Sequence, residues 1–345
     1  MSNSRLGISA LITTGGADLK FLGFLLLLLL VLAAAGAYAI YSPYGPTAET
    51  FVDVAPGTGA SAIAVQMEKA GIIRSRYGFD LLRLRKGGTM KAGEYRFDHP
   101  VKMAEVYDRL VQGDVYTQAL VIPEGFNIFD IASAVETAGF ARRDVFLAAE
   151  RRHTELIADL LPSGTRPVSL EGYLFPDTYR FSRHATPLHI LSAMVRRFRQ
   201  VSEQLGIDRA NMAETVTMAS LIEKEVGQDT ERPLVAGVFV NRLAESMPLA
   251  TDPTVIYAAL LDERWRGTIY ASDLQSPSLY NTYKHKGLPP GPIANPGIAA
   301  LRAAMHPAKT NYLYFVSDAA GHTRFSVGLK EHSEQVAAYR QAQKH

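Results

Sequence analysis

The feature that most constrains this chain is an uncharged apolar run at residues 21–41, FLGFLLLLLLVLAAAGAYAIY. As an α-helix rising about 1.5 Å per residue, the run would be roughly 30 Å long, which matches the hydrocarbon core of a bilayer. A helix inside a soluble protein is seldom apolar on every side. The run therefore predicts a single transmembrane helix.

The charges on either side of this run predict its orientation. Arg5 and Lys20 precede it, whereas the first charged residues after it are Glu49 and Asp53. By the positive-inside rule, the N-terminus is cytoplasmic and residues 42–345 lie outside the cytoplasm.

A cleaved signal peptide is the alternative, since Ala37-Tyr38-Ala39 resembles a small-x-small cleavage site. The apolar run is longer than the core of a usual signal peptide, which favours a retained anchor.

Composition excludes several classes of function. The chain has no cysteine, so thiol nucleophiles, disulfides and cysteine-based metal sites are ruled out. Its 47% apolar and 20% charged residues are typical of a folded protein. The net charge is +2, and the densest basic cluster is Arg196, Arg197 and Arg199 on an amphipathic segment, so nothing supports nucleic-acid binding. The motifs of zinc proteases, serine hydrolases and phosphate-binding loops are missing, so we expect no bound metal and no cofactor.

The exported part is predicted to be α+β. A strand at 51–54, a helix at 63–70 closed by Gly71, and a strand at 91–97 are followed by a helix over 103–113. The first strand–turn–helix pattern recurs at 119–140, which suggests two related α/β modules. Later segments are predicted as helices at 188–205, 212–226 and 231–245, a binding loop at 276–297 rich in proline and glycine, and a hairpin of 312–318 with 322–327.

MASLIEKEVG, residues 218–227, places acidic residues at the end of an apolar helix. With Ile222 at the centre of the apolar face, a step of about 100° per residue puts Glu225 roughly 60° from that centre and Glu223 about 100° away. Lys224 then faces solvent. Glu225 is thus predicted to be the more buried of the two carboxylates.

Two effects are expected to raise the pKa of Glu225. Gly227 ends the helix, so Glu225 lies in the last turn, where the helix dipole disfavours a negative charge. Apolar neighbours disfavour ionisation as well. A neutral carboxyl near pH 7 is suited to general acid catalysis. The alternative is that Glu223 or Glu225 forms a salt bridge with Lys224, Arg232 or Arg242.

The sequence resembles the MltG-type (YceG-like) endolytic murein transglycosylases from the apolar run nearly to the C-terminus. Seven blocks in order carry the resemblance: KAGEYRF (91–97), LEGYLFPDTYRF (170–181), MASLIEKE (218–225), VFVNRL (238–243), TDPTVIYA (251–258), YNTYKHKGLPPGPIANPG (280–297) and HPAKTNYLYFV (306–316).

The resemblance implies a single-pass protein of the inner membrane with its bulk in the periplasm. Its parts would be a cytoplasmic tail at 1–20, a transmembrane helix at 21–41, a LysM-like α/β module at 47–115 and a mixed α+β catalytic domain at 116–340. The resemblance also implies peptidoglycan strands as substrate, termination of strand elongation, and penicillin-binding-protein synthases as candidate partners.

In this family the essential acid is the second glutamate of the E-K-E block, which falls on Glu225 here. The implied reaction is non-hydrolytic cleavage between N-acetylmuramic acid and N-acetylglucosamine, which leaves 1,6-anhydro-muramic ends. The muramyl C6 hydroxyl is the nucleophile, so one carboxyl group suffices as acid and then as base.

Supporting roles are expected for residues in the matched blocks. Glu171 is either an acid behind Glu225 or a helix-start or loop residue. Asn281, Tyr280 and Tyr283 are expected to hydrogen-bond with and stack on sugars, or else to pack locally.

Three further residues complete the candidate site, together with Glu223. Asp252 precedes Pro253 and is favoured as the cap of a helix at 253–260, with a role in the site as the alternative. Thr251 and Asn241 are candidates for substrate contact. Two competing functions remain: a non-catalytic peptidoglycan-binding scaffold for wall synthases, and an exported protease of the envelope.

Overall fold

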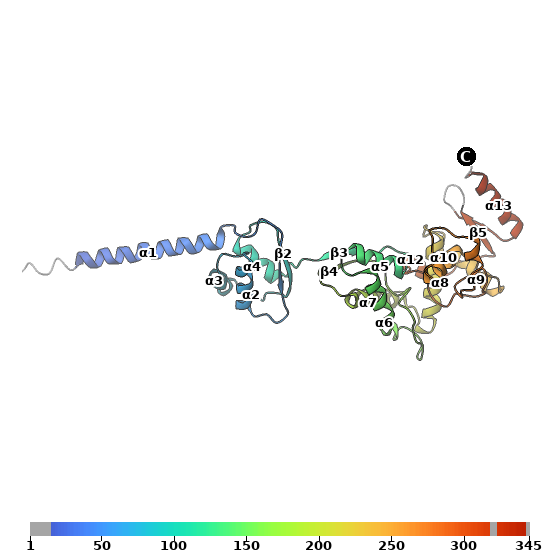
Figure 1. Ribbon diagram of the computed structural model, residues 1–345, viewed down its shortest axis with the longest axis horizontal. Helices are drawn as coiled ribbons and strands as arrows, with labels where there is room; N and C mark the ends of the chain where they lie inside the picture. The colour runs from blue at the N-terminus through green and yellow to red at the C-terminus, as the bar shows by residue number, and fades with distance from the viewer. Residues whose placement is uncertain (1–14, 318–322, 343–345) are drawn as a thin grey trace, which may run out of the picture. The chain divides into compact units, whose positions relative to one another are not determined.

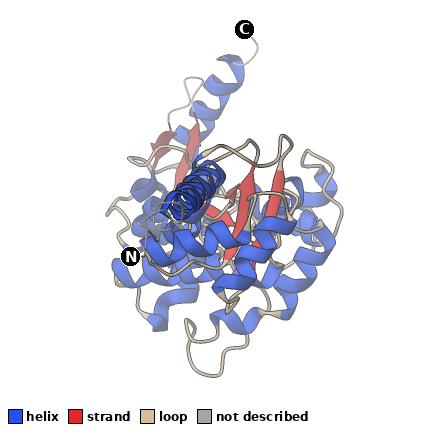
Figure 2. Cartoon of the chain, turned by 90° about the vertical axis from the view of Figure 1, so that its left-hand side faces the viewer, coloured by secondary structure: helices blue, strands red, loops and turns tan. Residues whose placement is uncertain are grey.

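A computed structural model describes residues 15–317 and 323–342 of the chain. The chain divides into two compact units, Met1–Thr117 and Gln118–His345, whose elements can be followed in order in Figure 1. The strands are short, and most of the described chain is helix or loop (Figure 2). This is a mixed α and β architecture, as predicted.

The first unit begins with the apolar helix. It contains α1 (Gly15–Tyr41), β1 (Thr50–Val54), α2 (Ala60–Lys69), α3 (Arg76–Lys86), β2 (Gly93–Phe97) and α4 (Met103–Gln112). Within α1, Lys20–Tyr41 is long and apolar enough to cross a membrane. The six leucines at 25–30 are all exposed, as expected of a helix that contacts lipid.

The remainder of the first unit is a small independent core. β1 and β2 pair antiparallel, with Val52 opposite Tyr95. The apolar face predicted for α4 is buried, and the helix ends at Gly113, which takes the left-handed conformation that glycine tolerates. The predicted strands and helices of this unit are confirmed, whereas α3 was missed because only Phe79 and Leu82 of its eleven residues are buried.

The second unit carries the larger core. It contains β3 (Gln118–Val121), α5 (Ile128–Thr137), α6 (Arg143–Arg152), β4 (Thr178–Phe181), α7 (Pro187–Leu205), α8 (Met212–Glu225), α9 (Arg232–Ala244), α10 (Asp252–Leu261), α11 (Ala271–Leu274), α12 (Ile298–Met305), β5 (Tyr314–Ser317), β6 (Thr323–Ser326) and α13 (Leu329–Ala342). Short 3₁₀ turns occupy Thr154–Ile157 and Arg209–Asn211.

α8 lies at the centre of this unit and packs against α9, α10 and α12. β3 pairs with β4, and β5 with β6, both antiparallel. The strand–turn–helix segments predicted at 51–70 and 119–140 both form, but their strands pair with different partners, β2 and β4. The predicted C-terminal hairpin is confirmed, and its turn, at 319–322, lies outside the described residues.

Gly172 joins the loop at 170–174 to this core. Its φ is +86°, and a Cβ there would lie 2.5 Å from the Cγ of Pro292 and 2.7 Å from Val216. Gly139 has a similar φ of +77° but faces open space. The two glycines therefore separate the effect of backbone conformation from that of close packing.

We expect Gly172→Ala to lower the free energy of unfolding by about 1–3 kcal/mol more than Gly139→Ala, because only the first adds a methyl group to a filled space. Denaturant unfolding of both variants measures the difference. Equal losses would show that the packing against Pro292 is not tight.

Candidate active site

α8 ends on the acid that the helical pattern singled out. Its buried face includes Val216, Leu221 and Ile222, and Glu225 is its last helical residue. Val226 leaves the helix in an extended conformation, with φ −135° and ψ 135°. The carboxyl group of Glu225 is thus placed at the negative end of the helix dipole, by a helix whose apolar face is buried in the core.

The carboxyl of Glu225 is almost enclosed by protein, although the residue as a whole is only partly buried. Burial raises its pKa to about 7, and the nearby charge of Asp252 adds to the rise. The Thr251 hydroxyl, which donates a hydrogen bond to Oε1, and the positive charge of Arg242 oppose it. Near pH 7 the carboxyl group is therefore protonated in a large share of the molecules.

Thr251 is positioned by the long loop at 276–297. Its backbone N–H donates to Oγ1 of Thr282 at 3.1 Å, and the N–H of Ala250 donates to the Thr282 carbonyl at 3.1 Å. Thr251 is buried, so its hydroxyl cannot turn to solvent. The loop that sequence composition marked as a binding loop therefore orients the partner of Glu225.

Arg242 is the residue that the sequence interpretation undervalued, since it entered only as an ion-pair partner. From α9 its guanidinium donates to the carbonyl of Leu313 at 2.6 Å and to that of Leu249 at 2.7 Å. It also stacks over the ring of Tyr314, 5.2 Å from the centroid. Arg242 thus ties the segment before Thr251 to β5 and places a positive charge near Glu225. Its place in the VFVNRL block was the available signal.

Asp252 does not cap a helix, contrary to the prediction. α10 begins at Asp252 itself, and the N-cap position falls on Thr251, whose side chain makes no capping bond because its hydroxyl is bonded to Glu225. The carboxylate of Asp252 instead accepts a 2.7 Å hydrogen bond from the hydroxyl of Tyr283. Tyr283 is exposed, so this pair lies at the surface beside Glu225.

Asn281 and Tyr280 build the loop. Asn281 is fully buried, and its amide donates to the carbonyls of Leu274 and Ser276, which corrects the prediction that it contacts sugars. Tyr280 is partly buried with its ring 5.1 Å from that of Tyr257, which matches the local-packing alternative.

Glu223 forms the salt bridge that was the alternative to catalysis. Its carboxylate lies 2.8 Å from Arg232, both side chains are only 5% exposed, and it also accepts the N–H of Gly297 at 2.9 Å. Through these contacts Glu223 links the end of α8 to Arg232 of α9 and to Gly297, which is a structural role. Asn241 likewise donates to the carbonyls of Thr310 and Tyr312 and so holds the segment that leads into β5.

Glu171 is a second buried acid. Its carboxyl accepts the N–H of Ile128 at 2.9 Å and the amide of Asn295 at 2.8 Å, and it is hydrogen-bonded to Tyr257. Burial raises its pKa to about 8. It therefore joins the start of α5, α10 and the long loop, and no contact of its own joins it to Glu225 among the described residues.

The hydrogen bond from Thr251 makes a prediction about titration. Thr251→Val removes the only described donor to the Glu225 carboxyl at nearly constant volume, so we expect the pKa of Glu225 to rise above its wild-type value. Carbon-13 NMR of labelled glutamate side chains measures it. Thr251→Ser retains the hydroxyl and is the control, and an unchanged pKa in Thr251→Val would refute the bond.

Comparison with known proteins identifies relatives along most of the chain. The model of the YceG-like family matches residues 52–338. A protein of Bacillus subtilis (strain 168) named endolytic murein transglycosylase is 34% identical over 305 residues, which are 84% of each chain. A protein of the same name from Streptococcus pneumoniae serotype 2 is 30% identical over 319 residues, and the match spans 84% of this chain but 58% of that relative.

A solved structure agrees with these matches. The crystal structure of a YceG-like protein from Listeria monocytogenes is 31% identical to this chain. The match has a TM-score of 0.52 and covers 84% of this chain and 99% of the other.

Proposed function

The chain belongs to the YceG-like family, and on that premise we propose that it is a murein transglycosylase that cleaves glycan strands internally, with Glu225 as its acid. The relatives named endolytic murein transglycosylase support the reaction class. The observation that carries the assignment to Glu225 is its enclosed carboxyl, which has a pKa raised to about 7 and which Thr251 orients through one of its two oxygens.

The proposed chemistry needs one such group. Glu225 protonates the oxygen that links N-acetylmuramic acid to the next N-acetylglucosamine, and the acetamido carbonyl of the substrate stabilises the developing positive charge. The carboxylate then removes the proton from the muramyl C6 hydroxyl, whose oxygen attacks C1 and closes a 1,6-anhydro ring. The nucleophile belongs to the substrate, so its effective concentration is high and no water is consumed.

Other residues serve Glu225 in this proposal. Thr251 orients the carboxyl, and Arg242 fixes the segment before Thr251. Tyr283, exposed and held by Asp252, offers a ring to a sugar face beside the acid. Thr251 and Arg242 are therefore proposed as positioning residues, and Tyr283 as a residue that contacts the substrate.

The remaining expectations concern location. We assign α1 as a retained single-pass anchor in the inner membrane, with the N-terminus in the cytoplasm and residues 42–345 in the periplasm, on the basis of its exposed apolar length and the charges that flank it. We assign the segment 47–115 as a LysM-like glycan-binding module, because it has its own core of two strands and three helices. Anchoring beside wall synthases would let cleavage end strand growth.

Replacement of the acid tests the proposal directly. Glu225→Gln keeps the size and the acceptor for Thr251 but has no proton to give, so we expect at least a 10²-fold loss of strand cleavage by full-length protein in detergent. Mass spectrometry should find anhydro-muramic ends with wild type and with the surface control Glu203→Gln.

The products separate the competing functions. Equal cleavage by Glu225→Gln would remove Glu225 from the mechanism, and free reducing ends would mean hydrolysis. A wild-type protein that binds sacculi and cleaves nothing would be the non-catalytic scaffold, whereas peptide fragments alone would indicate a protease.

The pH dependence follows from the raised pKa. The acid works when protonated, so we expect the rate of cleavage to fall as pH rises through about 7. The folded-state pKa lies above the unfolded one, so the associated stability is complete below about pH 4.5 and is lost as pH rises through 7. The Glu225→Gln variant has no carboxyl group at this position to ionise, so it does not lose this stability as the pH rises.

We therefore expect Glu225→Gln to be more stable than wild type above pH 8, by up to about 3 kcal/mol, and similar to it near pH 4. Thermal unfolding at several pH values measures the difference. A variant that is less stable at high pH would mean that the carboxyl is ionised at little cost.

A further inference from the structure

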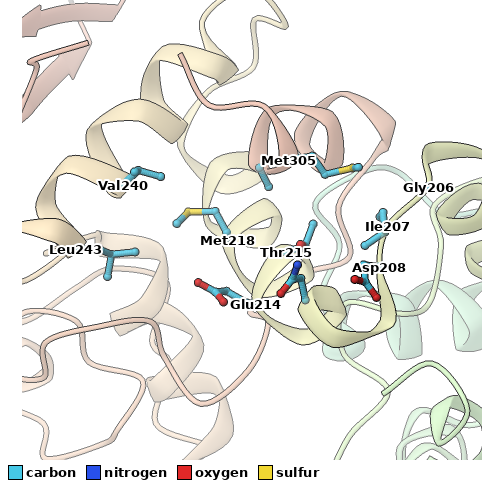
Figure 3. Close-up of a pocket in the computed structure, with 11 residues that line it drawn as sticks. Gly206, Ile207, Asp208, Glu214, Thr215, Met218, Val240, Leu243 and Met305 are labelled. Carbon is cyan, nitrogen blue, oxygen red and sulfur yellow. The ribbon is translucent and has the colours of Figure 1, made fainter. Parts of the chain in front are cut away.

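A cavity of about 540 Å³ opens beside the N-terminal half of α8, and Glu225 does not line it. In Figure 3, Val240 and Leu243 lie on one side and Ile207 and Asp208 on the other, with Met218, Thr215 and Glu214 between them. Apolar and polar side chains share its lining, and Asp208 and Glu214 are exposed acids within it.

A second hollow of about 730 Å³ adjoins the cavity. The two share Val240 and Met305, and the second is lined further by Asn241 and by residues 306–311. His306 and Lys309 are exposed there. The two hollows are called here the bipolar groove, because the acids Asp208 and Glu214 line the first, Lys309 lines the second, and the apolar Val240 and Met305 line both.

The bipolar groove is aligned with the proposed acid. With about 100° per residue, Glu214, Met218 and Glu225 fall within roughly 40° of one another on α8. With a rise of about 1.5 Å per residue, Met218 lies about 10 Å and Glu214 about 16 Å from Glu225 along the axis.

Helix α9 contributes residues both to the surroundings of Glu225 and to the bipolar groove. Arg242, which acts on the charge of Glu225, and Leu243, which lines the cavity, are consecutive residues of this helix. The same turn of α9 therefore borders both the acid and the groove.

We propose that the bipolar groove binds the stem peptide that the muramic acid of murein carries on its lactyl group. This inference rests on the proposed function and names a specificity determinant for it. Such a peptide has a free amine on a side chain and a carboxylate at its end. Asp208 and Glu214 face the amine, Lys309 faces the carboxylate, and the apolar wall accepts the chain between them.

The dimensions agree with this occupant. Extended peptide spans at most about 3.3–3.6 Å per residue, so three residues from a muramyl ring at Glu225 reach the level of Met218, about 10 Å away. The long side chain of a diamino acid at that point covers the further distance to Glu214. The enzyme would therefore favour strands whose muramyl groups still carry peptides.

Charge reversal at each end of the groove is the test. We compare full-length Glu214→Lys and Lys309→Glu in detergent on uncrosslinked strands that carry stem peptides and on strands stripped of them. Glu203→Lys and Arg302→Glu are matched controls, because both residues are exposed and line neither hollow.

We expect each groove variant to raise KM for peptide-bearing strands roughly five- to tenfold, with kcat unchanged and with no effect on bare strands. The controls should behave like wild type. Equal KM values of the wild type for the two substrates, or equal effects of the variants on both, would overturn the inference while leaving the proposed function intact.

A binding measurement covers the case in which no strand is cleaved and the proposed function fails. A synthetic stem tetrapeptide with a free side-chain amine is titrated into full-length protein by calorimetry. Binding that is weakened by Glu214→Lys and by acetylation of the peptide amine, but not by Glu203→Lys, supports the groove. A peptide that fails to bind at millimolar concentration refutes it.

Discussion

The candidate site is built around one arrangement, a carboxyl group enclosed at the end of α8 and bonded to the hydroxyl of Thr251. Burying a carboxylate costs free energy, and the helix end adds an unfavourable dipole, so the group resists ionisation. Several surrounding features serve to hold its partner in place. The 276–297 loop binds the backbone around Thr251, and Arg242 anchors the preceding residues to β5. Protein encloses the hydrogen bond between Thr251 and Glu225, so these contacts, and not solvent, hold its donor and acceptor in place.

Side chains replace secondary structure in the long loop. This loop contains no helix or strand, so its backbone groups need other partners. The amide of Asn281 donates to two carbonyls that precede it in the chain. The amide of Asn295 donates both to the carbonyl of Phe126 and to the carboxyl of Glu171. Amides carry both donors and acceptors, which explains why asparagine occurs at these buried positions. These two asparagines are buried because they hold the loop together, whereas Tyr283 is exposed.

Local patterns predicted much of this fold, and distant partners account for the misses. Apolar periodicity and the stop signals at Gly71 and Gly113 located the helices correctly, because those signals act within a few residues. The expected cap at Asp252 was wrong since Tyr283, 31 residues away, binds its carboxylate. The pairing of β3 with β4 joins strands more than fifty residues apart, which no local pattern reveals. The helical wheel favoured Glu225 over Glu223, but only the structure reveals that Glu223 is neutralised by Arg232.

Hydrogen-bond capacity distinguishes the two buried acids with raised pKa values. Glu171 has partners on both carboxyl oxygens, from Ile128 and Asn295, and a further bond to Tyr257, so nothing is left for a substrate. Glu225 has one donor among the described residues, Thr251 on Oε1, and its other oxygen remains available. An acid that transfers a proton to a sugar oxygen must keep one oxygen free of protein donors. The raised pKa that the two acids share therefore does not distinguish them, whereas the free oxygen of Glu225 supports its proposed role as the acid.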